Sequence, residues 1–231
     1  MKKILMLVLV FVLFLLVGDF FINRIEVTPE GISNVASDIL HQKILREDIP
    51  IAAHNNMIVD SAREQMGVVT SYDNQYYAGG YPPSDRGACT DVVAQALHDL
   101  GYNFKDRLDT DMRENPDTYT REYDSNINFR RVNNVEVYLG RYAKSLDTNF
   151  PQENNDNEMD WSDWLPGDIV TFDQIPGQLW HIAIVSDYAA HDGTPLLIHN
   201  HGNGTVENNM LLYWPSEVTG RYRLLLDEAN V

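Results

Sequence analysis

The chain has 231 residues, and its 34 Asp and Glu residues outnumber its 17 Lys and Arg residues, which gives a formal net charge of −17. A charge of this sign opposes binding to nucleic-acid phosphates or anionic lipid headgroups, because both need clustered cationic side chains. With 44% hydrophobic residues the chain can bury a sizeable core, which excludes wholesale disorder and a collagen-like or coiled-coil architecture.

The N-terminal segment has the pattern of an export signal. Two lysines follow the initial methionine, and residues 4–17 form an unbroken run of 14 apolar residues. The small-x-small cleavage pattern is absent after this run, so a retained membrane anchor is favoured over a cleaved signal peptide. We therefore expect residues 1–24 to be a signal peptide or membrane anchor, with a tether to the inner membrane through residues 4–22. Residues 25–231 would form one exported domain in the periplasm or cell envelope.

Three helices are expected in the first half of the chain. Apolar side chains recur at helical spacing over residues 33–46, 52–66 and 90–100, and a glycine follows each of the last two segments. Residues 72–83 contain four tyrosines among Gly, Pro and Asn residues, which predicts an aromatic loop. Such a loop suits a wet contact surface, and a satellite core cluster is the alternative.

The second half predicts one more helix and then a sheet. We expect the polar residues 102–133 to be irregular, with Arg130 and Arg131 on a solvated surface; binding of a carboxylate is the alternative for this pair. Helical spacing of apolar residues over 135–146 indicates a further helix. Short apolar runs separated by turn residues predict antiparallel strands over residues 168–172, 181–187, 195–199 and 221–226. Helices packed on an antiparallel β-sheet give an α+β fold class.

The sheet region carries an unusual charge distribution. Residues 145–220 contain twelve acidic residues, no Lys or Arg, and four of the seven histidines. Because an acidic field stabilises imidazolium, we expect these histidines to hold protons readily and a cationic substrate group to be attracted. Charge that serves only solubility is the alternative.

Cys89 is the candidate nucleophile. It is the single cysteine of the sequence, so an exported protein carries it as a free thiol. Its place is the first turn of the helix expected over residues 90–100, where unpaired N–H groups and the helix dipole favour a thiolate. The alternative is that Cys89 packs as a small buried hydrophobic residue.

Two histidines are candidates for the groups that activate the thiol. A nucleophilic thiol needs an imidazole within hydrogen-bond reach and a third polar group that orients the imidazole. His181 begins one predicted strand and His199 ends the next, so antiparallel pairing brings both to one end of the hairpin. Cys89 would then attack an amide carbonyl while His181 exchanges the proton and His199 orients His181. The Cys89 N–H would be an oxyanion donor.

These residues lie in segments that resemble the NlpC-type and CHAP-type cysteine peptidases and amidases. The segments are LPGDIV at 165–170, HIAIV at 181–185 and LIH at 197–199, together with the helix-opening cysteine. The resemblance implies a papain-like core and hydrolysis of amide bonds in bacterial cell-wall (peptidoglycan) peptides. It also implies that Cys89 is the nucleophile, His181 the base and His199 the third catalytic residue, with Asn200 as the alternative third residue.

A closer resemblance extends over roughly residues 55–225. GACTDVV at 87–93, together with Tyr72-Asp73, Tyr81-Pro82, Asp111-Met112-Arg113, Asn126-Ile127 and Arg130-Arg131-Val132, is similar to domain of unknown function 1287 (DUF1287). That family consists of bacterial envelope proteins placed in the same superfamily. NlpC-type enzymes commonly have Asp before the cysteine to hold a substrate amine, whereas this chain has Ala88. We expect the nearby tyrosines and acids to contact substrate instead, namely Tyr77, Tyr81, Asp85 and Asp91.

Two other functions compete with a cysteine hydrolase. His199 and His201 lie on one strand face and, with His181 or Asp187, would bind zinc and activate water. A non-catalytic envelope module would instead bind cell-wall peptides through the tyrosine loop, with a buried thiol. The leading prediction involves no cofactor and no metal, and a cell-wall peptide is its partner. The scissile bond, the oligomeric state and transfer to an acceptor other than water stay open.

Overall fold

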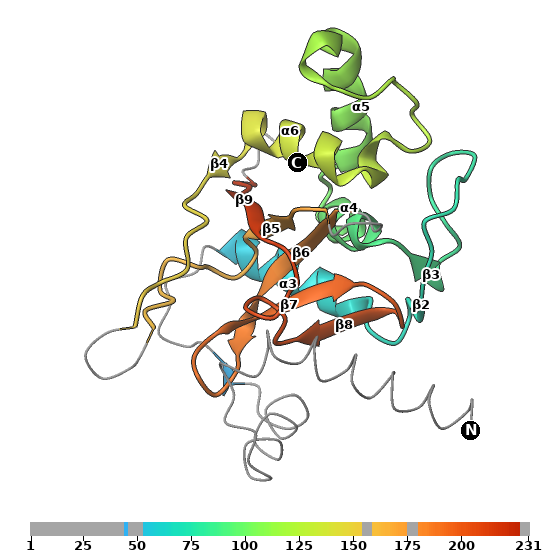
Figure 1. Cartoon of the computed structure of the whole chain (residues 1–231). Helices are drawn as coiled ribbons and strands as arrows, with labels where there is room; N and C mark the ends of the chain where they lie inside the picture. The colour runs from blue at the N-terminus through green and yellow to red at the C-terminus, as the bar shows by residue number, and fades with distance from the viewer. Residues whose placement is uncertain (1–43, 46–52, 154–158, 175–179, 227–231) are drawn as a thin grey trace, which may run out of the picture. The chain divides into compact units, whose positions relative to one another are not determined.

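The computed structural model describes residues 44–45, 53–153, 159–174 and 180–226 (Figure 1). The expected signal or anchor segment, the start of the expected domain and most of the helix expected over residues 33–46 lie outside these ranges. Ile44–Leu45 form strand β1, which pairs with β6, so that helix does not extend to residue 46 as expected. None of the helices in the described ranges has the length and apolar character that a membrane crossing requires.

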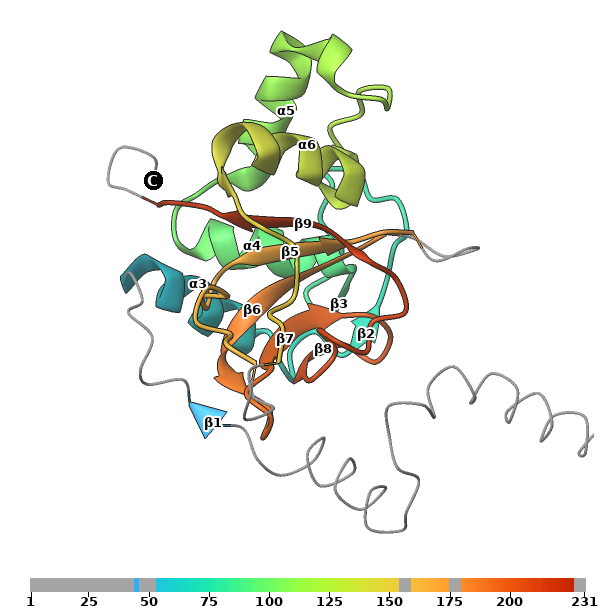
Figure 2. The same ribbon diagram turned by 60° about the vertical axis from the view of Figure 1, so that its left-hand side comes forward.

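The helices expected over residues 52–66 and 90–100 are present, and the one expected over 135–146 lies earlier, because it ends at residue 142 and residues 144–145 form a strand instead. They are α3 (Ala53–Glu64), α4 (Cys89–Asp99) and α6 (Val132–Tyr142). In both views α3 and α4 lie along one side of the sheet, and α5 and α6 lie together at one end of it (Figures 1 and 2).

Helix α5 (Phe104–Glu114) corrects the expectation that residues 102–133 are irregular. Phe104, Leu108 and Met112 recur four residues apart and are all buried, so they form one apolar stripe on a helix that is otherwise charged. The average polarity of the segment conceals this stripe. Asn103 caps the helix by accepting a hydrogen bond from the Asp106 N–H at 3.4 Å. Two short 3₁₀ turns follow, η1 (Pro116–Thr118) and η2 (Asn128–Arg130).

The sheet is antiparallel, as expected, and its strands follow the order β4-β9-β5-β6-β7-β8. Their bounds are β4 Lys144–Ser145, β5 Ile169–Phe172, β6 His181–Ala189, β7 Pro195–Asn200, β8 Thr205–Asn208 and β9 Val218–Arg223. Strand β9 begins before the predicted residue 221, and β8 is a short polar strand that the sequence pattern does not indicate. A separate parallel pair joins β2 (Ser71–Tyr72) and β3 (Arg86–Gly87), just before α4. The α+β fold class is thus confirmed.

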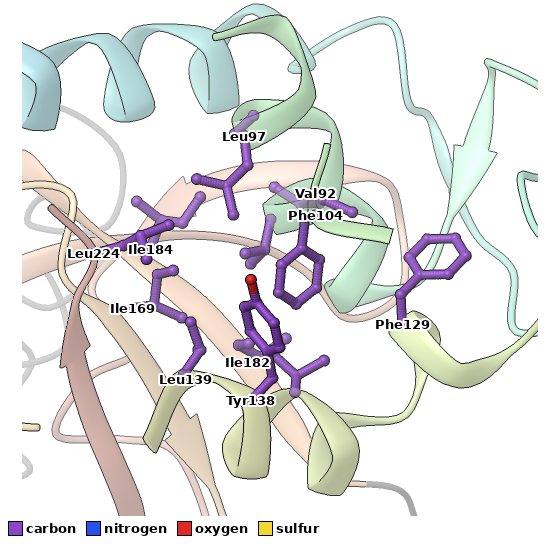
Figure 3. Close-up of a cluster of buried hydrophobic side chains, with 14 of the residues drawn as sticks. Val92, Leu97, Phe104, Phe129, Tyr138, Leu139, Ile169, Ile182, Ile184 and Leu224 are labelled. Atoms are coloured by element: carbon purple, nitrogen blue, oxygen red, sulfur yellow. The ribbon is translucent and has the colours of Figure 1, made fainter. Parts of the chain in front are cut away.

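Both faces of the central strands are covered. Ile182 and Ile184 of β6 face the helices and pack with Leu97, Phe104 and other members of the main core (Figure 3). Ala183 of the same strand faces a second apolar cluster on the other side of the sheet. A strand buried on both faces needs a continuous apolar run instead of an alternating one, and this run allows α4 to pack closely along β6.

Candidate active site

Cys89 is the first residue of α4 and lies at the wall of a cavity of about 330 Å³. Ala88 before it is extended, so the helix begins abruptly at the cysteine. The Ala88 N–H donates a hydrogen bond to Asp91 Oδ2 at 2.7 Å, which fixes this first turn. The side chain is 4% exposed, so the thiol is largely enclosed but borders the cavity.

Burial raises the pKa of the Cys89 thiol to about 12. The nearby backbone N–H of Ile182 lowers the pKa, as do the N–H groups of Thr90 and Cys89 at the helix N-terminus, while the Asp91 charge raises it. Loss of water around the sulfur outweighs the helix N-terminus, which was expected to favour a thiolate. The resting thiol is therefore neutral at neutral pH.

His181 and His199 lie in direct contact. His181 Nε2 is 2.7 Å from His199 Nδ1, and His199 Nε2 is 2.9 Å from Asn208 Oδ1. A carbonyl oxygen only accepts, so His199 carries its proton on Nε2 and accepts through Nδ1 from the His181 Nε2–H. His181 Nδ1 is thereby left with its lone pair available. That nitrogen is able to accept a proton from a thiol.

The protonation expected for these histidines is wrong. Burial lowers the pKa of His181 well below 6.5, and the neighbouring His199 and His201 lower it further. Burial also lowers the pKa of His199 to about 4, although the hydrogen bond to Asn208 opposes this. The acidic residues of the region do not compensate for the loss of water around the rings. Both imidazoles are neutral near pH 7, which is the form that a general base requires.

The sulfur of Cys89 lies beside the start of β6. The Ile182 N–H is close enough to the sulfur to lower the thiol pKa, so the sulfur lies near the residue that follows His181. In the described ranges the His181 ring and the sulfur share no hydrogen bond and His181 does not line the Cys89 cavity, so proton transfer requires the two side chains to move toward each other. Trp214 stacks on the His181 ring, with centroids 3.9 Å apart and planes at 13°, and restricts its orientation.

Asn200, the alternative third residue, has a different position. Its Nδ2 donates to the backbone oxygens of Gly87 at 2.8 Å and Ser71 at 3.1 Å. Adjacent residues of a strand point to opposite faces, so His199 and Asn200 cannot both face His181. Asn200 therefore holds the segment that leads into Cys89, while His199 contacts the ring of His181.

The structure places the four expected substrate-contacting residues outside the wall of the Cys89 cavity, as far as the described residues show. The Tyr77 hydroxyl donates to Asp73 Oδ2 at 2.8 Å, and the Tyr81 ring packs against Phe129 at a tilt of 47°. Asp85 pairs with Arg86 at 2.9 Å. Asp91 caps α4 and pairs with Arg130 at 2.9 Å. Tyr81 and Asp91 border a second cavity, which shares Ala88 with the first.

Arg130 is not on a solvated surface, which corrects that expectation. Its side chain is 2% exposed. Besides the ion pair with Asp91, it donates to the backbone oxygens of Gln75 at 2.5 Å and Asp73 at 2.6 Å. A buried guanidinium needs such partners, and here they tie the tyrosine loop to the start of α4. The ion pair with Asp91 is a form of the carboxylate binding given as the alternative, but the partners are distant in sequence, so no local pattern identified them.

Three residues of the site were not anticipated from the sequence. Asn208 stands at the end of β8, and only the pairing of β7 with β8 brings it to His199. Trp214 lies in an irregular segment, and Trp180, just before His181, lines the Cys89 cavity. Asn208 could have been found from the sequence only if strand β8 had been predicted, because the β7–β8 register then places it near His199.

The alternative zinc ligands do not form a metal centre among the described residues. His199 and His201 have centroids 4.9 Å apart, but no group of three or more His, Cys, Asp or Glu side chains in those ranges is arranged to hold a metal ion. Asp187 forms an ion pair with Arg63, which also pairs with Glu207 at 2.8 Å.

Comparison with known proteins identifies a family whose match includes the candidate site. The family model "Domain of unknown function (DUF1287)" matches residues 59–224, which include every candidate catalytic residue. The chain is also 38% identical over 185 residues to "Uncharacterized protein YijF" of Escherichia coli (strain K12), an alignment that covers 76% of this chain and 84% of the relative.

Proposed function

The chain belongs to the DUF1287 family, and we propose that it is an exported cysteine hydrolase with a papain-like core that cleaves amide bonds of cell-wall peptides. Cys89 is the nucleophile, His181 the general base and His199 the group that orients His181. Asn208 fixes the tautomer of His199.

The observation that carries this proposal is the hydrogen-bond relay from Asn208 through His199 to His181. It leaves the lone pair of His181 Nδ1 available, and the next residue of the strand, Ile182, has an N–H near enough to the Cys89 sulfur to lower the thiol pKa. The candidate nucleophile stands at the N-terminus of a helix and at the wall of a cavity, and the strand that begins with the candidate base packs against that helix. Burial of polar side chains is costly unless they are hydrogen-bonded, and buried ionisable groups with shifted pKa values are concentrated at functional sites.

The reaction begins from a neutral thiol and a neutral imidazole. As the sulfur attacks the substrate carbonyl carbon, its proton passes to His181 Nδ1 and an oxyanion forms, stabilised by the Cys89 N–H at the helix N-terminus. Collapse of this intermediate breaks the C–N bond, and the His181 proton goes to the leaving amine. Water then attacks the thioester while His181 takes its proton, and cleavage of the C–S bond returns that proton to the sulfur.

Two features support the expected location and fold. The apolar run over residues 4–17 after two lysines is typical of exported chains. A helix-opening cysteine packed against an antiparallel sheet that carries the histidines is the arrangement that a papain-like core requires.

The test is digestion of purified peptidoglycan with the full chain, followed by mass spectrometry of released peptides. We expect peptide release by the unaltered protein and a decrease of several orders of magnitude in Cys89→Ala and His181→Ala. His98→Ala, a change at an exposed helix residue, is the matched control and retains activity. Unchanged release in either active-site variant rejects the assignment, and the identity of the products reveals the scissile bond.

One observation favours a second function, a non-catalytic module that binds cell-wall peptides. The Cys89 thiol has a raised pKa and, within the described ranges, no hydrogen bond to His181. On this alternative Cys89 is a packing residue, so Cys89→Ala binds peptidoglycan as well as the unaltered protein does, and neither releases peptides.

A further inference from the structure

The cavity beside Cys89 has a cationic wall. Three arginines line it, Arg121, Arg130 and Arg131, and among the described residues no Asp or Glu does so. This composition is opposite to that of the chain, in which acidic residues outnumber basic residues by 34 to 17. The acidic region 145–220 contributes only Trp180 to the described lining. The cavity therefore does not attract a cationic group, in contrast to the expectation from overall charge.

The three arginines differ in whether their charge is compensated. Arg130 is paired with Asp91 and enclosed, so it is part of the wall and does not offer a free guanidinium. Arg131 donates one hydrogen bond, from Nη1 to the backbone oxygen of Glu122 at 3.2 Å. In the described part of the chain, neither Arg131 nor Arg121 forms an ion pair with a carboxylate. Both side chains are partly or fully exposed and retain donors for a ligand.

We infer that Arg121 and Arg131 bind a carboxylate of the substrate next to the amide bond that Cys89 attacks. This inference rests on the proposed function, since it places the carboxylate relative to that bond. A guanidinium presents a planar pair of N–H donors that matches the two oxygens of a carboxylate. Two guanidinium groups at one cavity therefore bind an anion with one or two negative charges well. The volume of about 330 Å³ accommodates a ligand group of this size beside the aromatic wall of Trp180 and Tyr72. The substrate class is an acidic peptide.

Binding is tested without turnover in Cys89→Ala. The probes are one disaccharide-tetrapeptide purified from peptidoglycan and the same molecule with its carboxylates converted to carboxamides. By calorimetry we expect the free-acid probe to bind more tightly, and Arg131→Gln added to this background to weaken its binding about 10- to 100-fold. Affinity for the amidated probe stays unchanged, which also shows that the variant is folded. Arg113→Gln, an equal charge change outside this cavity, is the control.

Turnover of the same two probes by the otherwise unaltered protein separates this inference from the proposed function. If both probes are cleaved with equal kcat/KM, and if the double variant with Arg121→Gln and Arg131→Gln has the same kcat/KM values, the carboxylate site is overturned and the hydrolase assignment stands. Selective binding that Arg131→Gln abolishes, without cleavage of either probe, supports the carboxylate site and rejects the hydrolase. Absence of both binding and cleavage overturns both.

Discussion

The neutral state of His199 predicts a pH dependence of stability. The side chain is 0% exposed, and burial lowers its pKa from 6.5 to about 4. Between these values the unfolded chain binds a proton at this residue and the folded chain does not. The stabilisation is therefore complete above pH 6.5 and is lost as the pH falls toward 4.

The size of the effect follows from the two pKa values. The full difference between 6.5 and about 4 corresponds to about 3 kcal/mol, of which about 2 kcal/mol is lost between pH 7.5 and pH 5.0. This window lies above the usual pKa range of carboxylates. The pKa of His181 is also lowered by burial, so its contribution has the same sign.

Urea unfolding at pH 7.5 and pH 5.0 measures this dependence. We expect the unaltered protein to lose at least about 2 kcal/mol of unfolding free energy, and His199→Gln to lose about 2 kcal/mol less than that over the same interval. His98→Gln removes an exposed histidine and serves as the control, with the dependence of the unaltered protein. Equal unfolding free energies at the two pH values in the unaltered protein refute the argument from burial.

Four further predictions concern the site and the fold. Asn208→Ala removes the acceptor that fixes the His199 tautomer. Steady-state kinetics should therefore show a fall in kcat of about 10- to 100-fold with little change in KM. A change in KM with kcat intact contradicts the relay. With a pKa of about 12, the Cys89 thiol should react with iodoacetamide at pH 7.5 about 1,000-fold more slowly than a free thiol. Mass spectrometry measures the labelling rate, and labelling at the free-thiol rate contradicts the burial of Cys89. Phe104→Ala should lower the unfolding free energy by about 3 to 5 kcal/mol, whereas a loss below about 1 kcal/mol argues against a packed α5. Gly204 has φ of +97°, and a Cβ there would lie 2.3 Å from the Val69 oxygen, so Gly204→Ala should lower the melting temperature. Gly202→Ala is the control and should not lower it, because the space around its Cβ is open. Equal melting temperatures of the two variants contradict this close approach.

Periodicity in the sequence predicted the elements whose apolar side chains recur without interruption. The helices near Cys89 and the strands that carry His181 and His199 are of this kind, and antiparallel pairing of those strands was enough to suggest that the histidines meet. Helix α5 was not predicted, because its stripe of Phe104, Leu108 and Met112 is diluted by charged residues. Strand β8 is too short and polar to give a strand pattern, although it carries Asn208.

The properties of the site that depend on long-range contacts could not be predicted. The Arg130 and Asp91 side chains meet across 39 positions of sequence, so no local pattern marks their ion pair. The protonation of His199 was expected from nearby acidic residues in the sequence, but burial in the folded chain decides it. Charge composition describes the whole chain, whereas the wall of a cavity depends on the few side chains that the fold brings there.

The central claim is that Cys89 forms a covalent thioester with a cell-wall peptide. The most direct measurement is mass spectrometry of the protein after acid quenching of a reaction with purified peptidoglycan peptides. The account predicts an acyl adduct on the peptide that contains Cys89, removable by hydroxylamine and absent from Cys89→Ala. Release of peptides at an equal rate by Cys89→Ala, with no adduct on the unaltered protein, would contradict it.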